Sequence, residues 1–195
     1  MDGQHWMASA MRAARSQLEI AAHNLANVST DGFRRALGTT RLGAGGLDVT
    51  RRTVRDQGAV HQTGRRFDLA LLGEGAFRVG AGTTRDGAFT RDRDGHLVDD
   101  RGHRLRGERG DVSVSENATV ASDGAICDGG RVVDRLPLPP GTRVMAGALE
   151  SSAVNAIGET LAILTAQRAF ETAEKTLSAI DAARQKAAND VARVQ

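Results

Sequence analysis

Residues with catalytic or metal-binding potential occur in the 195-residue chain, but their spacing does not assemble a reaction centre. Asp92-Arg93-Asp94-Gly95 resembles the start of a calcium loop, yet Thr90 and Arg101 stand where such a loop needs Asp and Glu. The five histidines contain no i, i+4 pair, and the serines lack the context of a nucleophile elbow. We therefore predict a hairpin turn at Asp94-Gly95 and expect no enzyme, cofactor or metal ion.

Two further motifs have simple structural interpretations. Gly43-Ala44-Gly45-Gly46 lacks the preceding strand and the following Lys-Ser/Thr of a phosphate-binding loop, so it predicts a flexible linker. Cys127 is the only cysteine, which excludes an intrachain disulfide and a cysteine-based metal cluster. Its neighbours Ile126 and Asp128 cannot activate a thiolate, so a small buried or incidental side chain is expected.

The charges are numerous but nearly balanced. The net charge is +2 and the isoelectric point is about 9.3, with Lys175 and Lys186 as the only lysines. Between Arg51 and Arg109 the arginines alternate with carboxylates, which predicts a solvated surface of mixed charge. The segment Arg51-Arg52-Thr53-Val54-Arg55 leaves an alternative open, a basic nucleic-acid-binding protein, although such proteins more often gather their cations on one face.

The composition and the N-terminal residues indicate what kind of core and which targeting signals to expect. Hydrophobic residues make up 40% of the chain but aromatic residues only 3%, so we expect a thin core of small side chains. Residues 1–6 lack a basic start before an apolar run, which predicts no cleavable secretory signal. No stretch approaches the roughly 18 apolar residues of a membrane span.

Both ends of the chain have the periodicity of one-sided helices. Near the N-terminus apolar residues recur in steps of four and three, as in a heptad seam: Met7, Met11, Ala14, Leu18, Ala21 and Leu25. The run meets no Pro or Gly until Asp31-Gly32, which predicts a turn. Each helix must bury its apolar face, and the simplest partner is the other terminal helix, followed by another copy of the chain.

The C-terminal segment contains two apolar stripes. Val154, Ile157, Leu161 and Leu164 form the first. The second consists of Phe170, Ala173, Leu177, Ile180, Ala187, Val191 and Val194, with Arg184 interrupting it. The six-residue step from Leu164 to Phe170 predicts that the buried stripe changes its face there, or that the helix bends.

The central region has the period of two that is typical of strands. Short apolar runs between about residues 67 and 133 alternate with turn signals, four of which are Asp-Gly pairs suited to tight hairpins. The plan is an α+β fold with terminal helices flanking a small, mainly antiparallel β domain. The predicted segments are an N-terminal helix and turn at 1–36, an extended linker at 37–64, the β domain at 65–145 and a C-terminal helix at 146–195.

Two distant stretches resemble the flagellar rod and hook protein family. Residues 24–34, Asn-Leu-Ala-Asn-Val-Ser-Thr-Asp-Gly-Phe-Arg, are similar to that family's N-terminal signature, and residues 166–171, Ala-Gln-Arg-Ala-Phe-Glu, to its C-terminal helix. Residues 57–70, 90–98 and 147–155 match further family segments in the same order. His23 and Ala76 depart from the pattern, where Asn and an aromatic residue are usual. The short central region leaves no room for the extra domain of hook proteins, which favours a rod subunit.

The resemblance implies a structural subunit of the flagellar basal-body rod. It implies that the terminal helices pair as a coiled coil, pack against neighbouring subunits as the wall of a hollow shaft and transmit torque to the hook. Its implied partners are other copies, other rod or hook subunits and the export apparatus, with no nucleic acid and no membrane insertion. The implied location is the basal body, reached without a cleaved signal. The turn at residues 27–33 would redirect the chain from the helix.

The resemblance and the apolar seams together nominate subunit-interface residues. These are Met11, Leu18, Asn24, Leu25, Ala26, Asn27, Gly32, Phe33, Leu161, Leu164, Gln167, Arg168, Phe170, Leu177 and Ile180. A third interpretation also remains open, namely a monomer whose two helices pair only within one chain.

Overall fold

The structure, a computed structural model, describes residues 3–193 and, for residues 190–193, the backbone alone. The chain divides into two compact units, which are described separately. Unit 1 contains residues 1–26, 35–54 and 155–195, and unit 2 contains residues 27–34 and 55–154. The ends of the predicted segments 1–36 and 146–195, and the side chains of Val191 and Val194, lie outside the described residues. The predicted α+β class, with helices at both ends and antiparallel strands between them, is confirmed.

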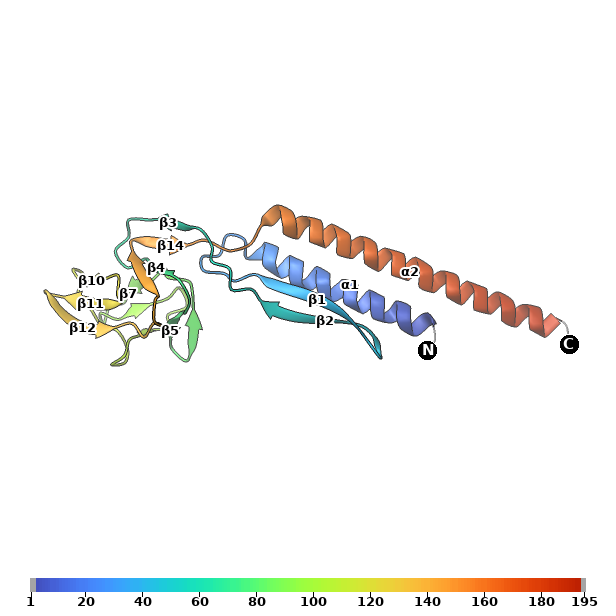
Figure 1. Cartoon of the computed structure of the whole chain (residues 1–195), viewed down its shortest axis with the longest axis horizontal. Helices are drawn as coiled ribbons and strands as arrows, with labels where there is room; N and C mark the ends of the chain where they lie inside the picture. Colours follow the sequence, from blue (N-terminus) through green and yellow to red (C-terminus); the bar gives the residue numbers. More distant parts are fainter. Residues whose placement is uncertain (1–2, 194–195) are drawn as a thin grey trace. The chain divides into compact units, whose positions relative to one another are not determined.

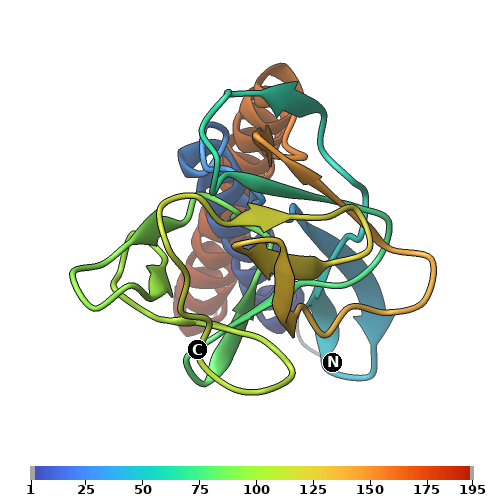
Figure 2. The ribbon, with the colours of Figure 1, turned by 90° about the vertical axis from the view of Figure 1, so that its left-hand side faces the viewer.

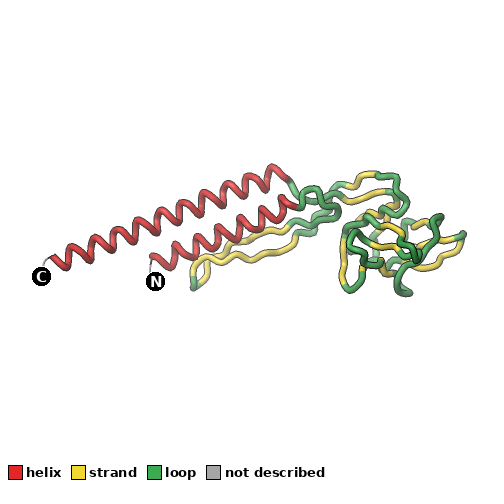
Figure 3. The backbone as a smooth tube through the Cα atoms, turned by 180° about the vertical axis from the view of Figure 1, so that it is seen from behind, coloured by secondary structure: helices red, strands yellow, loops and turns green. Residues whose placement is uncertain are grey.

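Unit 1 consists of two long helices and a β-hairpin that lies along the first helix (Figures 1 and 3). Helix α1 spans Gly3–Ala26 and helix α2 spans Ala156–Arg193. The helices are antiparallel, because Asn24 contacts Glu159 whereas Gln4, at the other end of α1, bonds to Asp181. Helix α2 continues for twelve residues beyond Asp181.

Local sequence explains where α2 begins. Asn155 is its N-cap, since its side-chain Oδ1 accepts hydrogen bonds from the backbone N–H groups of Ile157 at 3.1 Å and Gly158 at 3.2 Å. Glu159 adds a negative charge to the first turn, where the helix dipole favours it. All three prolines lie at positions 137–140, so none interrupts either helix.

The buried row of α2 differs from the predicted stripes. It runs through Glu159, Ile163, Ala166, Phe170, Ala173, Leu177 and Ile180, in continuous steps of four and three. The predicted change of face after Leu164 is therefore wrong for the single subunit. Leu161 and Leu164 lie on another side of α2 and are exposed, because the smaller Ala166 and the neighbouring Ile163 take the positions that face α1. Along the predicted seam of α1, Ala14 and Ala21 are buried, whereas Met7, Met11, Leu18 and Leu25 are half-buried.

The predicted linker at 37–64 contains a hairpin. Strands β1 (Ala36–Gly43) and β2 (Gly46–Thr53) pair antiparallel from Ala36↔Thr53 to Gly43↔Gly46. The Gly43–Gly46 stretch is thus the hairpin turn rather than a flexible linker. The glycines indicate a turn. The segments on either side of them are rich in Thr and Arg and do not alternate between apolar and polar residues, so the sequence does not predict the two strands.

Unit 2 is built from short antiparallel strands joined by turns, as Figure 2 shows. Two three-stranded sheets have the orders β10-β11-β12 and β6-β5-β9, and the remaining strands form the pairs β13-β4, β14-β3 and β7-β8. The strands are β3 (Val60–Gln62), β4 (Leu69–Leu72), β5 (Phe77–Val79), β6 (Gly82–Thr84), β7 (Thr90–Arg91), β8 (Leu97–Val98), β9 (Leu105–Arg106), β10 (Thr119–Val120), β11 (Ala125–Asp128), β12 (Arg131–Arg135), β13 (Arg143–Ala146) and β14 (Ala148–Glu150).

The core of unit 2 contains larger side chains than composition suggested. Phe77 and Phe89 meet edge to face, with ring centroids 5.2 Å apart, and Leu69, Leu97 and Leu105 are fully buried beside them. The expectation of small core side chains is therefore wrong here, because leucine, isoleucine and two of the phenylalanines fill this core. Phe77 also supplies an aromatic core side chain next to the atypical Ala76.

The Asp-Gly turns differ from the expected geometry. Gly95, Gly124 and Gly129 connect paired strands and have positive φ, but no described residue other than glycine does. The aspartates instead accept backbone hydrogen bonds. Asp92 Oδ1, for example, accepts the N–H groups of Asp94 at 2.9 Å and His96 at 2.7 Å. These hydrogen bonds define an Asx-type turn at residues 92–96, whereas the turn between β11 and β12 has two left-handed residues, Gly129 with φ 57° and Gly130 with φ 78°.

Gly32 shows why the turn after α1 requires glycine. Its φ is +65°, and a Cβ placed on it would clash with the backbone of Arg85 and Asp86. We predict that Gly32→Ala lowers the stability of unit 2 by more than the roughly 1–2 kcal/mol of left-handed strain alone. Gly102→Ala is the matched control, because Gly102 has φ +81° with open space around its Cβ position. Urea unfolding of both variants checks this, and equal losses would show that the contact with residues 85–86 is unimportant.

Candidate functional site

The carboxamide of Asn24 joins three segments of unit 1. Its Nδ2 donates to the carbonyl of Ala36 at 2.8 Å, and its Oδ1 accepts the N–H of the same residue at 2.9 Å. Nδ2 also lies 3.1 Å from Oε2 of Glu159 in the first turn of α2. Asn24 is only 1% exposed, so these contacts replace water completely. One side chain thus links the end of α1, the start of β1 and the start of α2.

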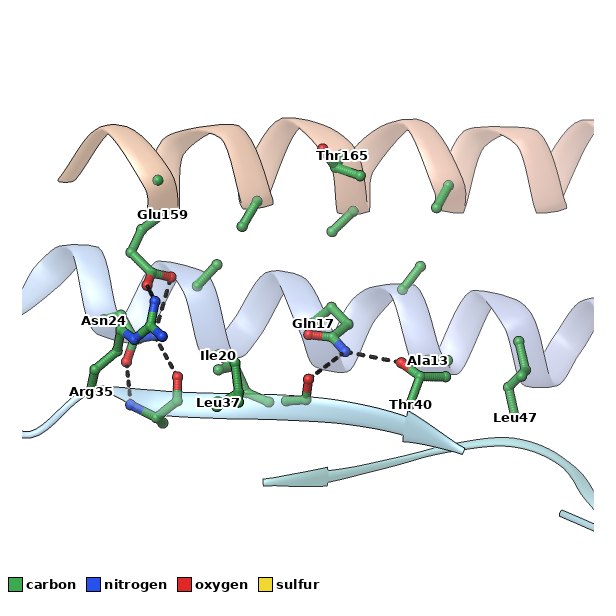
Figure 4. A pocket seen from close by; sticks show the side chains of 18 of the residues that line it. Ala13, Gln17, Ile20, Asn24, Arg35, Leu37, Thr40, Leu47, Glu159 and Thr165 are labelled. Carbon is green, nitrogen blue, oxygen red and sulfur yellow. Dashed lines mark hydrogen bonds and ion pairs between the residues drawn. The ribbon is translucent and has the colours of Figure 1, made fainter. Parts of the chain in front are cut away.

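Glu159 is the acidic member of this cluster. Its side chain is almost completely buried, and its Oε1 lies 3.5 Å from a guanidinium nitrogen of Arg35. A buried carboxylate needs both a counter-charge and hydrogen bonds, which Arg35 and Asn24 supply. We call Asn24, Arg35, Ala36 and Glu159 the polar clasp (Figure 4).

Two further polar side chains of α1 hold the hairpin. Gln17 Nε2 donates to the carbonyl of Gly38 at 3.2 Å and to Oγ1 of Thr40 at 3.0 Å. Ser9, which is fully buried, accepts the N–H of Leu47 at 3.2 Å. Because Ser9, Gln17 and Asn24 are spaced by eight and seven residues, they share one face of α1. The hairpin is therefore attached to α1 along its whole length.

A groove of about 550 Å³ lies between α1, α2 and β1. Figure 4 shows Asn24, Arg35 and Glu159 at one end, with Gln17 and Thr40 in the middle and Leu47 toward the other end. Most of its remaining lining is small, including alanines at positions 10, 13, 14, 21, 162, 166 and 169. We call it the small-residue groove. Its shape suits large apolar side chains, whereas its charged residues are already paired with each other.

The second half of the N-terminal signature lies in unit 2. The N–H of Gly32 donates to the carbonyl of Glu150 at 2.6 Å, and the carbonyl of Phe33 accepts the N–H of Ala153 at 3.2 Å. Glu150 is 2% exposed and its side chain forms an ion pair with Arg85, which is 6% exposed. These bonds attach the turn to strand β14.

The Arg85 guanidinium donates all of its hydrogen bonds to groups within unit 2. It donates to the carbonyls of Leu71, Gly73 and Gly75 at 2.9–3.1 Å, in addition to Glu150. Arg34 lies at the edge of this pair, 4.0 Å from Glu150 Oε1. Partial burial lowers the pKa of Arg34, and the Arg85 cation lowers it further, whereas Glu150 and Asp56 raise it. Two guanidinium groups therefore share one buried carboxylate.

The structure brings together only some of the nominated interface residues. Asn24 lies in the polar clasp, and Gly32 and Phe33 lie in the unit 2 turn with Asn27, whose Oδ1 accepts a hydrogen bond from Thr30 at 3.3 Å. Half-buried seam positions are Met11, Leu18, Leu25, Phe170, Leu177 and Ile180. Exposed positions are Ala26, Leu161, Leu164, Gln167 and Arg168. None of the exposed set lines the small-residue groove.

Sequence reasoning missed several residues of the site. Glu159 and Arg35 were not nominated, although a charged residue on a heptad row is a usable signal. Because the first predicted stripe of α2 contains Ile157, Leu161 and Leu164, the sequence analysis did not predict the buried row that contains Glu159. Ser9 and Gln17 gave no signal, because their partners are backbone and hydroxyl groups of a hairpin that was not foreseen.

The described residues contain neither a cluster that could bind a metal ion nor a helix that could span a membrane. No group of three or more His, Cys, Asp or Glu side chains among them could hold a metal ion. Neither helix, over its described length, is apolar enough to cross a membrane.

A substitution at Asn24 tests the polar clasp. Asn24→Ala removes the partner of both backbone groups of Ala36, each at a cost of about 1–3 kcal/mol, and removes one hydrogen bond of Glu159, which keeps its ion pair with Arg35. We expect the helices of unit 1 to unfold at clearly lower urea concentration, as measured by circular dichroism at 222 nm. Glu19→Ala is the control, because it removes only an exposed i, i+4 pair with Arg15, worth about 0.3–0.5 kcal/mol. Equal effects of both substitutions would contradict a stabilising role of the clasp.

Asp86 lines a hollow of unit 2 together with Asp31, Asp99 and Asp100. Burial raises the pKa of Asp86, the N–H of Ala88 lowers it, and the three other carboxylates raise it further, for a net increase. The ionised form therefore destabilises the fold above the pKa of the unfolded state, and this cost disappears as both states become protonated at low pH.

Asp86→Asn keeps an Oδ1 acceptor for Ala88, which donates at 3.0 Å, and removes the charge. We expect the variant to unfold at higher temperature than the natural chain at pH 7, with the gain vanishing by about pH 3. Asp94→Asn, in an exposed turn, serves as control. A gain that is independent of pH would rule out the electrostatic explanation.

Comparisons with known proteins agree with the two signature regions. The family described as flagella basal body rod protein matches residues 7–34. The family described as flagellar basal body rod FlgEFG protein C-terminal matches residues 145–190. These segments contain most of α1, the turn, and α2 up to Asp190.

Similarity to individual proteins extends over nearly the whole chain. The flagellar basal-body rod protein FlgF of Escherichia coli (strain K12) is 30% identical, with 91% of this chain and 94% of that protein covered. FlgG of Bacillus subtilis (strain 168) is 27% identical over 93% of this chain and 96% of its own length. The hook protein FlgE of Brucella abortus is 36% identical, but only 58% of this chain and 32% of that protein are covered. The chain therefore belongs to the flagellar basal-body rod protein family.

Proposed function

We propose that the chain is a structural subunit of the bacterial flagellar basal-body rod. In this role it polymerises through its terminal helices into a hollow helical shaft, which transmits torque to the hook. The observation that carries the proposal is the exposed apolar row on α2, within the segment that matches the rod family. Ile157, Leu161 and Leu164 expose 75%, 59% and 47% of their surface, and such a row needs a partner outside the subunit.

The helix pair of unit 1 supports this role. We propose that the heptad rows on α1 and α2 continue as a coiled coil in the assembled state. Ala14, Ala21, Ala166 and Ala173 are buried and allow close approach of two helices, but each contributes little apolar area. A pair built on alanine is marginal alone, and neighbouring subunits would stabilise it further.

The partners and location follow from the same proposal. We expect contacts with other copies and with other rod or hook subunits, in the basal body. The residues to which we assign these contacts are the exposed and half-buried nominees on both helices. Export without a cleaved signal through the flagellar export apparatus is likewise part of the proposal. The comparisons give no support to the alternative of a nucleic-acid-binding protein.

A motility assay tests the proposal. Leu25→Asp and Leu177→Asp each place a carboxylate on an apolar helix row, where burial without a partner is costly. We expect both to reduce swarming in a strain whose own rod subunit is deleted and replaced by this chain. Arg93→Asp is the control, because Arg93 is exposed in the turn between β7 and β8. Equal motility of the three variants would show that the helix rows are not subunit contacts, and failure of the natural chain to enter basal bodies would refute the rod assignment.

A further inference from the structure

The outer face of the β6-β5-β9 sheet carries two arginines side by side. Arg78 of β5 lies directly opposite Arg106 of β9. Their neighbours Val79 and Leu105 are buried in the core, so strand alternation places both guanidinium groups on the outer face. Like charges at opposed positions destabilise an antiparallel pair. Arg106 Nε lies 3.6 Å from Oδ1 of Asp111, but Arg78 forms no hydrogen bond or ion pair with any residue that the structure describes.

These two arginines line a hollow of unit 2 with a volume of about 690 Å³, which we call the basic hollow. Its other charged residues are Glu108 and Arg109, in the turn that follows β9. Arg109 Nη1 donates to the carbonyl of Val133 at 3.0 Å, whereas the Glu108 carboxylate has no partner among the described residues. The remaining lining is glycine, alanine and threonine at positions 80–83, 107 and 110. The lining therefore contains three cations and one anion, none of them paired with another.

The turn between β8 and β9 has the opposite charge pattern. Residues 100–104 are all exposed, and the side chains of Asp100 and Arg101 are 71% and 79% exposed. Their closest charged atoms are 4.0 Å apart, which leaves both groups free for closer partners. Burial raises the pKa of the nearby Asp86, and its neighbouring carboxylates, Asp100 foremost, raise it further. The carboxylates around this turn therefore repel one another. We call residues 99–101 the acidic turn.

We propose that the acidic turn of one copy inserts into the basic hollow of another copy, with Asp100 between Arg78 and Arg106. Arg101, next to Asp100, then approaches Glu108, the free carboxylate of the hollow. This inference rests on the proposed function as a polymerising subunit and assigns the residues of one contact between copies. The contact relieves two repulsions of the isolated subunit, because a carboxylate separates the paired arginines and cations approach the crowded carboxylates.

The chemistry of the hollow favours carboxylates over the phosphates of a nucleic acid. A guanidinium forms two parallel hydrogen bonds with one carboxylate. Nucleic-acid sites place cations along an extended backbone and add aromatic side chains for stacking, whereas this hollow is compact and none of the residues that line it is aromatic. Among carboxylates, those of a second copy are supported by the chain itself, since every copy carries both the hollow and the turn.

The contact is weak when it acts alone. Its charged groups are exposed, and exposed ion pairs contribute little individually and are screened by salt. Two isolated copies therefore associate only slightly through it. The contact becomes effective when each subunit makes it together with other contacts in a polymer, so its tests use assembled rods.

Chemical cross-linking tests which residues meet. In a Cys127→Ser background, Arg78→Cys and Asp100→Cys chains with different tags are expressed together in a flagellated strain that lacks its own rod subunit. An Arg–Asp ion pair holds its Cα atoms farther apart than a disulfide can bridge, so isolated basal bodies are treated with a short bismaleimide. We expect a product that carries both tags. In the control, Arg143→Cys replaces Arg78→Cys and should give no mixed product, because Arg143 is exposed on β13 and does not line the hollow.

Charge reversal provides the second arm. Arg78→Glu should lower incorporation into basal bodies about three- to tenfold, because it turns an attraction into a repulsion, and Asp100→Arg should do the same. The double variant should restore incorporation to within about twofold of that of the natural chain. Asp94→Arg, in another exposed turn, is the control and should leave incorporation unchanged.

Thermal unfolding of the isolated subunit separates this effect from misfolding. Arg78→Glu places a carboxylate opposite Arg106, and Asp100→Arg removes one from the surroundings of Asp86. Neither substitution should therefore lower the melting temperature. If one does, Arg78→Gln or Asp100→Asn takes its place and should reduce incorporation about two- to threefold.

The outcomes distinguish this inference from the proposed function. Absence of the natural chain from basal bodies overturns both. If the natural chain enters, the lack of a mixed cross-link, or a double variant no better than the single ones, overturns the contact and leaves the rod assignment intact. Duplex DNA bound by the purified subunit at about 0.15 M salt, and lost in Arg78→Glu, would assign the hollow to phosphates and also overturn it. If the cysteine chains do not enter basal bodies, the charge-reversal variants decide.

Discussion

The organisation of unit 1 depends on one buried carboxamide. Both Nδ2 and Oδ1 of Asn24 form hydrogen bonds with the backbone of Ala36, and Nδ2 also donates to Glu159. The start of the hairpin and the start of α2 are therefore fixed to the same turn of α1. A hydrophobic residue there could fill the space but could not bond to an edge of β1. Net energies of such bonds are modest, yet leaving their partners buried and unpaired is costly. The clasp therefore specifies the arrangement more than it stabilises it.

Along the rest of unit 1, small apolar side chains rather than polar ones are buried between the helices. Alanine at the buried positions of both helices allows close approach but provides little hydrophobic free energy, while ordering each residue costs about 1–2 kcal/mol of backbone entropy. The same small side chains leave a groove beside α1. Large apolar residues that could have filled it, such as Leu161 and Leu164, instead face outward on α2. A sequence optimised only for a stable single chain would place them inside.

Sequence alone was sufficient for the helices, the β-rich middle and the family, because long heptad rows and ordered motifs are local signals. It failed where the decisive partner is distant. Helix α2 has apolar residues on more than one side, so periodicity could not tell the Ala166 row, which meets α1, from the Leu161 row. The β1–β2 hairpin was missed because its strands are held by Gln17 and Ser9 of α1 rather than by an alternating apolar pattern of their own. Asn24 and Gly32 were nominated from the family signature, but their partners Glu159 and Glu150 lie more than a hundred residues away.

The signature at residues 24–34 satisfies requirements from both units. Asn24 must pair with backbone and carboxylate groups of unit 1, whereas Gly32 must fit without a Cβ against the backbone of residues 85–86 in unit 2. The buried Arg85–Glu150 pair adds a third condition, because Glu150 also receives the N–H of Gly32. Replacing such a pair by apolar residues is often neutral for stability, so its retention is better explained by the fixed position that it gives to the turn. An eleven-residue stretch can thus be tightly constrained by contacts in two separately packed units.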